Sequence, residues 1–137
     1  LGEEDGLAAA KTARIAQSKA ALAAYLEAHP IQWTDGAYYA ITADKQQQLA
    51  SKIMAATMAQ TLSADYRLTW NSTGEVCREW TLPDLSALAF AIDARVTALV
   101  TYQQTQEVAM RGAETLDDLR AVTVDYDSVG GTDAAGG

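Results

Sequence analysis

The sequence predicts a mostly helical α+β fold in the order helix, β-hairpin, helix, β-hairpin, long helix, short helix. Three observations lead to this prediction. Alanine is abundant among the 49% hydrophobic residues and phenylalanine occurs once, which favours helices packed through small side chains. Two stretches place glycine turns between alternating apolar residues, the pattern of hairpins. Apolar residues at helical spacing fill the remaining segments.

The first helix is predicted from Gly6 to the residue before Pro30, because proline cannot continue a helix. Its apolar stripe consists of Ile15, Leu22 and Leu26, with alanine filling much of the remainder. Such a narrow stripe is typical of a docked arm or a coiled-coil seam.

The first hairpin is predicted over residues 31–42, because Asp35-Gly36 tolerates the positive φ angles of a two-residue type I′ turn. This loop would set Trp33 opposite Tyr38.

The next helix is predicted over residues 43–62, with Asp44 and Gln47 as its capping pair. The residues expected on its apolar face are Leu49, Ile53, Met54, Ala56, Met58 and Leu62.

The second hairpin is predicted between Tyr66 and Trp80, with a three-residue loop that ends at Gly74 in the left-handed conformation. This register pairs Trp70 with Val76 and Tyr66 with Trp80. The opposite face of its second strand then carries Glu75, Cys77 and Glu79.

The long helix is predicted over residues 82–110, capped by Thr81 and with Asp84 in its first turn. A heptad rhythm follows Leu85, Ala89, Ile92, Val96 and Leu99, and continues through Gln103 and Gln106 to Met110. The glutamines indicate that the second half of this helix is more exposed to solvent or forms a polar layer between helices. A short helix restarts after Gly112, with Thr115 and Asp118 as its caps. We expect one domain over residues 1–126 and a flexible Gly-rich tail over residues 127–137.

Composition excludes several classes of function. The formal net charge is -8 and no run of Lys or Arg occurs, so we expect no nucleic-acid partner and no anionic membrane surface. We find no apolar run of the roughly 20 residues that span a bilayer, and expect no membrane insertion. One cysteine excludes an intramolecular disulfide.

A catalytic thiol is disfavoured by the neighbours of Cys77. The carboxylates of Glu75 and Glu79 oppose thiolate formation, and the one histidine, His29, stands at a helix end beside a proline. One His and one Cys make a protein zinc site very improbable. We therefore expect no catalytic residues, no metal and no cofactor.

Two further motifs have simpler interpretations. Glu75 and Glu79 could serve a glycosidase only if they flanked a cleft, and an exposed hairpin face explains both. Asn71-Ser72-Thr73 satisfies the acceptor pattern for N-glycosylation, but its role in the turn is a sufficient explanation.

Aromatic residues gather on the two predicted hairpins. We expect Trp33, Trp70 and Trp80 to cover the helices as core, since they alternate in phase with Leu68 and Val76. Tyr39 falls on the opposite face of its hairpin and is the better surface candidate. Tyr and Trp are enriched at binding hot spots. The candidate interaction surface is Tyr39, Tyr38 and Arg78.

The order of these parts is similar to an uncharacterised domain family of bacteriophage and prophage tail-fibre and tail-associated proteins. The similarity runs from "AAAKTARIAQSKAALAAYLEA" through "QWTDGAYYAITADKQQQLASKI" and "LTWNSTGEVCREWTLPDLSALAFAIDARV" to "RGAETLDDLRAV", roughly residues 11–122. Its most specific pieces are the helix start at Asp44, Gln47 and Leu49, and the block from Trp70 to Leu82. The family commonly has an Asp-Asn-like turn where this chain has "NSTGE".

The resemblance implies a non-enzymatic structural or interaction domain, with other phage tail proteins as partners. It places the protein in the bacterial host cytoplasm during assembly and then in the virion tail. A homotrimer is a further hypothesis from the resemblance, with the stripes Ile15–Leu22 and Leu85–Leu99 as candidate contacts. The alternatives are a tail-fibre assembly chaperone and, less favoured, a glycan-active enzyme.

Overall fold

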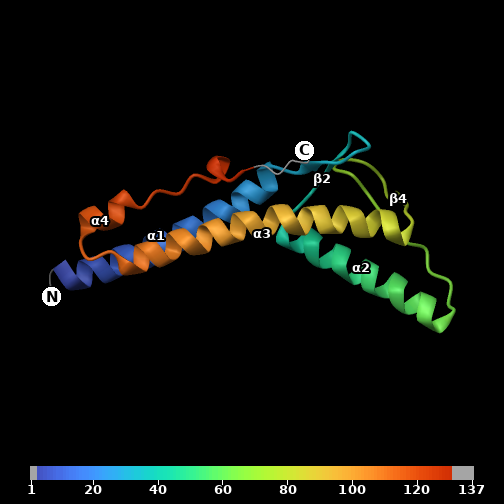
Figure 1. Ribbon diagram of the computed structural model, residues 1–137, viewed down its shortest axis with the longest axis horizontal. Coiled ribbons are helices and arrows are strands. Elements are labelled where there is room, and N and C mark those ends of the chain that lie inside the picture. The colour runs from blue at the N-terminus through green and yellow to red at the C-terminus, as the bar shows by residue number, and fades with distance from the viewer. Residues whose placement is uncertain (1–2, 131–137) are drawn as a thin grey trace. The chain divides into compact units, whose positions relative to one another are not determined.

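The computed structural model describes residues 3–130 of the chain. Each of its two hairpins is a two-stranded antiparallel sheet. The elements follow the predicted order, so the predicted fold class is confirmed (Figure 1). They are α1 (Glu3–Ala28), β1 (Ile31–Gln32), β2 (Tyr38–Tyr39), α2 (Ala43–Leu62), β3 (Thr69–Trp70), β4 (Arg78–Glu79), α3 (Leu82–Gly112), α4 (Leu116–Ala121) and the 3₁₀ turn η1 (Tyr126–Ser128).

Threonine caps begin two of the helices as predicted. The Thr81 hydroxyl accepts the backbone N–H of Asp84 at 3.2 Å at the start of α3. The Thr115 hydroxyl accepts the backbone N–H of Asp118 at 3.0 Å at the start of α4. Each bond satisfies an N–H group that the first helical turn leaves open.

The cap of α2 differs from the prediction. Thr42, not Asp44, occupies the N-cap position with an extended backbone, and its hydroxyl accepts the N–H of Lys45 at 3.4 Å. The Gln46 side chain then donates to the carbonyl of Ile41 at 2.8 Å. The predicted Asp44–Gln47 pair is therefore wrong, because the helix begins at Ala43 and Asp44 already lies inside its first turn.

The register of the first hairpin differs by one residue from the prediction. Ile31 lies opposite Tyr39 and Gln32 opposite Tyr38, whereas the two-residue loop would have set Trp33 opposite Tyr38. A one-residue shift moves every side chain of one strand to the other face. Tyr39 consequently turns toward the core and Tyr38 toward solvent.

The turn chemistry of Asp35 explains this shift. The backbone N–H of Trp33 donates to Ala37 at 2.8 Å, which leaves a three-residue loop with Gly36 at φ 85°. The Asp35 carboxylate accepts the N–H of Ala37 at 2.9 Å, so this side chain closes the wider loop.

The second hairpin is shifted by two residues from its predicted register. Trp70 lies opposite Arg78 rather than opposite Val76, and Val76 stands in the longer loop, 86% exposed. Gly74 has the predicted left-handed conformation, with φ 79°. A shift of two residues preserves the faces of the strands. Leu68 and Trp70 are therefore buried, as predicted.

The longer loop is held by contacts that the turn sequence does not reveal. The Asn71 amide donates to the carbonyl of Glu75 at 3.0 Å inside the loop. The backbone N–H of Thr73 donates to the carbonyl of Tyr38 at 2.8 Å, which fastens this loop to β2 of the first hairpin.

The chain divides into two compact units, which we describe separately. Unit 1 contains the residues up to Tyr25 and residues 97–130, and unit 2 contains residues 26–96. Helices α1 and α3 each contribute residues to both units. The single domain over residues 1–126 stays a prediction. Of the predicted tail, residues 131–137 lie outside the described residues, and its first residues belong to η1.

The core of unit 1 joins the first half of α1 to the end of α3 and to α4. Ile15, Met110, Ala113 and Leu119 are buried together. The partly buried residues packed against them are Leu7, Ala10, Val122 and Val124. Ile15 therefore belongs to a docked helix, one of the two predicted roles for its stripe.

A polar layer lies beside this apolar cluster. Ser18 and Gln103 are 2% and 4% exposed, and the Gln103 amide donates to the Ser18 hydroxyl and to the Glu107 carboxylate, both at 3.1 Å. The Ser18 hydroxyl donates to the carbonyl of Ile15 at 2.7 Å. The predicted polar layer is thus confirmed at Gln103.

The segment after α4 is tied to α1 by side chains. The Arg14 guanidinium donates to the carbonyl of Val122 at 2.6 Å and to that of Leu119 at 3.2 Å. The buried Tyr126 donates its hydroxyl proton to the carbonyl of Ser18 at 2.6 Å. These bonds hold the segment after α4 against α1.

The core of unit 2 joins α2, the first half of α3 and both hairpins. On α3 the predicted heptad is confirmed at Leu85, Ile92 and Val96, to which the structure adds Leu88. The other elements contribute the buried residues Tyr39, Ile41, Leu49, Ala56, Leu68 and Trp70. The ring of Trp70 is also covered by the ammonium groups of Lys45 and Lys52, 5.4 and 5.9 Å from its centroid.

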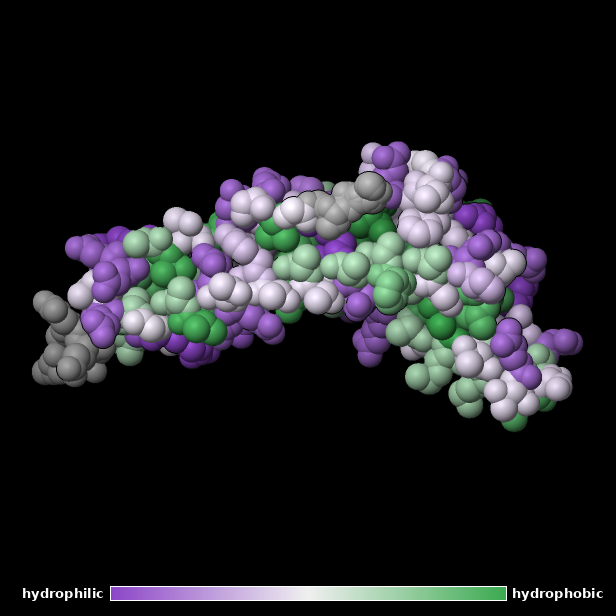
Figure 2. Space-filling model, in the orientation of Figure 1, coloured by the Kyte–Doolittle hydropathy of each residue, from purple (hydrophilic) through white to green (hydrophobic). Residues whose placement is uncertain are grey.

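The outward face of α2 carries large apolar side chains. Met54, Met58 and Leu62 are 64%, 55% and 69% exposed, although they were predicted on the same apolar face as Leu49 and Ala56, which are buried. At 100° per residue they lie opposite Leu49 and Ala56, so α2 is apolar on two faces. Hydrophobic residues accordingly gather along the outer edge of α2 in Figure 2.

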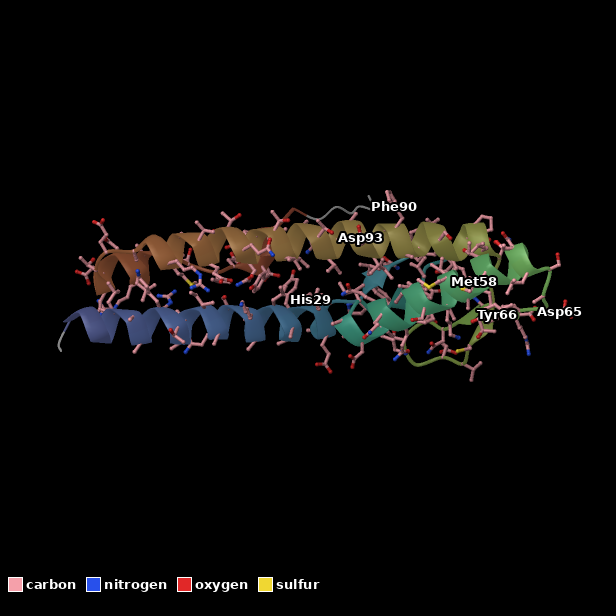
Figure 3. All side chains as sticks on the ribbon, turned by 90° about the horizontal axis from the view of Figure 1, so that it is seen from below. His29, Met58, Asp65, Tyr66, Phe90 and Asp93 are labelled. Carbon is pink, nitrogen blue, oxygen red and sulfur yellow. The ribbon has the colours of Figure 1, made fainter. Side chains whose placement is uncertain are left out.

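Helix α3 also has an uncovered apolar surface. By length and composition it is the single helix within residues 3–130 that could cross a membrane, and 28% of its most apolar window is buried in the fold. The core helix of a soluble protein meets the same criterion, so this property is weak evidence for a membrane. Phe90, 78% exposed, extends from α3 away from α2 (Figure 3).

Candidate functional site

The three predicted surface residues differ in their exposure. Tyr38 is 49% exposed, and the Arg78 side chain is 55% exposed. Tyr39 is 1% exposed, so its predicted place on the surface is wrong. The one-residue shift of the first hairpin is the reason, because it turns Tyr39 toward Trp80, whose ring it meets edge-on at 5.7 Å.

Asp35, Tyr39 and Arg78 form one hydrogen-bonded group that joins the two hairpins. The Tyr39 hydroxyl donates to Asp35 Oδ2 at 2.8 Å, and Arg78 Nη2 donates to the same oxygen at 3.1 Å. The guanidinium carbon of Arg78 lies 4.0 Å from the centroid of the Trp80 ring. A guanidinium fixed by both a carboxylate and an aromatic face loses little further freedom when it binds a ligand.

The contacts of this group shift two pKa values in opposite directions. Partial burial works to raise the pKa of Asp35, but hydrogen bonds from Ala37, Tyr39 and Arg78 outweigh it and hold the pKa below its usual value. Burial, followed by the hydrogen bond to Asp35, raises the pKa of Tyr39. Near neutral pH the group therefore contains a carboxylate, a neutral phenol and a guanidinium.

The lowered pKa of Asp35 predicts a pH-dependent contribution to the stability of unit 2. Because the folded pKa lies below the unfolded one, the contribution is present above the unfolded pKa and is lost as the pH falls through the folded pKa. We expect Asp35→Asn to lower the free energy of unfolding by about 0.5–1 kcal/mol at pH 7. The difference from the unmodified protein should shrink below about pH 4.

Urea unfolding followed by tryptophan fluorescence measures this effect, since all three tryptophans lie in unit 2. Asp93→Asn serves as the control, because Asp93 is exposed on α3 (Figure 3) and takes no part in the group. A difference for Asp35→Asn that stays constant down to pH 2 would contradict the assignment.

A hollow of about 270 Å³ opens beside this group. It is lined by Trp33, Thr34, Asp35, Arg78, Trp80 and two residues of the first turns of α3, Asp84 and Ala87. Trp80 also lines a second hollow of about 330 Å³, on whose border Arg67 and Glu79 form an ion pair of 2.6 Å. Trp80 is thus half-buried between two concave surfaces of unit 2.

The other residues considered for chemistry have different surroundings. Cys77 is exposed, with its Sγ 3.8 Å from Asn71 Oδ1, and His29 is exposed near the end of α1 (Figure 3). Glu79 is paired with Arg67, and Glu75 is exposed in the loop. In the part of the chain that the structure describes, no group of three or more His, Cys, Asp or Glu residues could hold a metal ion.

Comparison with protein-family models, with curated proteins and with solved structures finds no match for this chain. The candidate site therefore depends on its own geometry. Sequence reasoning identified Arg78 but treated Asp35 as a turn residue and Asp84 as a residue that opposes the helix dipole. One feature of the sequence could have indicated this site: the charged residues Asp35, Arg78 and Asp84 lie within four residues of a tryptophan, Trp33 or Trp80.

Proposed function

We propose that this chain is a non-enzymatic structural or interaction domain of a bacteriophage or prophage tail fibre or tail-associated protein. The family assignment is supported by the resemblance over residues 11–122. In the fold, the block from Trp70 to Leu82 contains the last residue of β3, the whole of β4 and the first residue of the long helix α3. The proposal assigns the domain to the assembling tail in the host cytoplasm and later to the virion.

The outward face of α2 is the observation that carries the interaction role. Met54, Met58 and Leu62 follow one another at four-residue spacing and are more than half exposed. Met58 lies on α2 in Figure 3. Methionine side chains adapt their shape and are frequent at protein-binding surfaces. Contiguous exposed apolar residues of this kind mark sites where proteins associate.

A second copy of this chain is the partner that the charges favour. Copies with a net charge of -8 repel one another, but no acidic residue occurs between Asp44 and Asp65. Two copies can therefore approach through α2 without bringing carboxylates together. The stripes first considered for trimer contacts are used inside the fold, since Ile15, Leu85 and Leu99 are buried. A homotrimer would then form through α2.

Light scattering coupled to size exclusion tests this proposal. We expect the unmodified protein to elute as an oligomer and the triple variant Met54→Gln, Met58→Gln, Leu62→Gln to elute as a monomer. Val76→Gln, Val108→Gln and Phe90→Gln together form the control, because they remove exposed apolar residues outside α2. A protein that remains monomeric at high concentration contradicts self-association.

Purified particles test the place of the domain in the virion. A structural part of the tail remains in the particle and is detected there by mass spectrometry. If the protein is found with assembling fibres and is missing from finished particles, it acts as an assembly chaperone instead.

A further inference from the structure

The chemistry of the 270 Å³ hollow beside β4 restricts the ligands that it can take. Its lining combines two indole rings, a guanidinium, two carboxylates and a hydroxyl, supplied by Trp33, Trp80, Arg78, Asp35, Asp84 and Thr34. A small number of convergent polar groups around aromatic walls is typical of small-molecule sites. Its volume is slightly below the range of about 300–1,000 Å³ that is common for drug-sized ligands.

The lining contains charges of both signs, with the guanidinium held against one of the two carboxylates, so it does not favour an ion of one sign. A cation would meet the guanidinium of Arg78, which is fixed in place by Asp35 and by the Trp80 ring. An anion would meet the carboxylate of Asp84, which is exposed in the first turn of α3, and also that of Asp35. A neutral ligand with many hydroxyl groups avoids both penalties and can bond to donors and acceptors alike.

We propose that this hollow binds one saccharide unit of a glycan. The apolar face of the sugar ring packs on the half-buried indole of Trp33. The Asp84 carboxylate accepts hydrogen bonds from sugar hydroxyls, and Arg78 donates to a sugar oxygen. The inference goes beyond the proposed tail function and does not depend on it.

The hollow is organised before any ligand binds. The backbone N–H of Ala37 and the Tyr39 hydroxyl hold the Asp35 carboxylate at 2.9 and 2.8 Å, and Asp35 in turn holds Arg78. Tyr39 is buried, so this arrangement is anchored in the core of unit 2. Asp35 thus positions the site, and Arg78, Asp84 and Trp33 are the residues expected to meet the sugar.

Nuclear magnetic resonance of the indole N–H signals of Trp33 and Trp80 tests the proposal. The probes are glucose, galactose, mannose and N-acetylglucosamine, each titrated into the full chain. We expect at least one of them to shift both signals saturably, with a dissociation constant in the millimolar range that is common for single sugars, on the order of 1 mM. Tetramethylammonium and sulfate serve as the cationic and anionic probes and should leave both signals unchanged.

Three variants decide where the sugar binds. Asp84→Asn should weaken binding roughly tenfold, the loss expected for a hydrogen bond to a charged group. Ala87→Leu should abolish binding because the larger side chain fills the hollow from an exposed position of α3. Asp93→Asn removes the same charge from the same helix outside the hollow and should leave the affinity unchanged (Figure 3).

Several results would overturn the proposal. These are the absence of a saturable shift with all four sugars, a saturable shift with tetramethylammonium or sulfate at both indoles, and equal weakening by Asp84→Asn and Asp93→Asn. Thermal unfolding of each variant confirms that it remains folded. The residues replaced in the α2 variants do not line the hollow. The sugar-binding result is therefore independent of the result on self-association.

Discussion

Replacing Leu88 by alanine is expected to lower the free energy of unfolding of unit 2 by about 3 kcal/mol. Leu88 is 0% exposed and stands on α3 between Leu85 and Ile92, which are also buried. The change removes the transfer free energy of the lost methyl groups and leaves a cavity in the closely packed core. Urea unfolding followed by tryptophan fluorescence measures it, because the three tryptophans report on unit 2.

Phe90→Ala is the matched control on the same helix. Phe90 has the larger side chain but is 78% exposed, so its removal opens no cavity. Alanine also has the higher helix propensity, and the change should stay within about 0.5 kcal/mol. Equal losses of stability for the two variants would contradict the assignment, because they would show that the Leu88 side of α3 is no more buried than the Phe90 side.

The helices could be predicted because their signals are local. The spacing of Leu85, Ile92 and Val96 and the threonine caps are properties of a few neighbouring residues, and α2 spans the predicted residues 43–62. Which apolar residues of α2 face inward was harder to predict. Met54 and Met58 follow the same helical spacing as buried residues, and periodicity does not distinguish a core face from an outer apolar face.

The registers of the hairpins could not be predicted from turn residues alone. Asp35-Gly36 fits both a two-residue and a three-residue loop. The hydrogen bond from the N–H of Ala37 to the Asp35 carboxylate stabilises the three-residue loop. In the second hairpin, the bond from Thr73 to the carbonyl of Tyr38 comes from the other hairpin. Both decisions depend on contacts that exist only after the chain has folded.

The candidate site shows the same limit. Arg78 and Tyr39 were recognised as residues of interest, but their common partner Asp35 lies 43 residues from Arg78 along the chain. The group depends on the first hairpin having the observed register, because only then does Tyr39 meet Trp80 and Asp35. An error of one residue in a turn was therefore enough to place Tyr39 on the wrong face.

The polar layer of unit 1 leads to the second prediction of large effect. Gln103→Glu is expected to lower the stability of unit 1 by roughly 3 kcal/mol at pH 7, because it places an unpaired charge in a buried position. Gln103 is 4% exposed, and its amide donates to both Ser18 and Glu107. Glutamate would lose both donations and would face the Glu107 carboxylate. Arg111 and then Gln103 hold the pKa of Glu107 below its usual value, so Glu107 is charged at pH 7.

Acidification should partly rescue this variant. Burial and the like charge raise the folded pKa of a glutamate at position 103 above its unfolded value, so protonation favours the folded state as the pH falls toward 5. Gln104→Glu is the control, since Gln104 is the exposed neighbour on α3 and should change the stability by less than about 0.5 kcal/mol. Urea unfolding followed by circular dichroism at pH 7 and pH 5 compares the two variants. If Gln103→Glu is as stable as Gln104→Glu at pH 7, the side chain at position 103 is solvated and the buried polar layer between α1 and α3 does not exist.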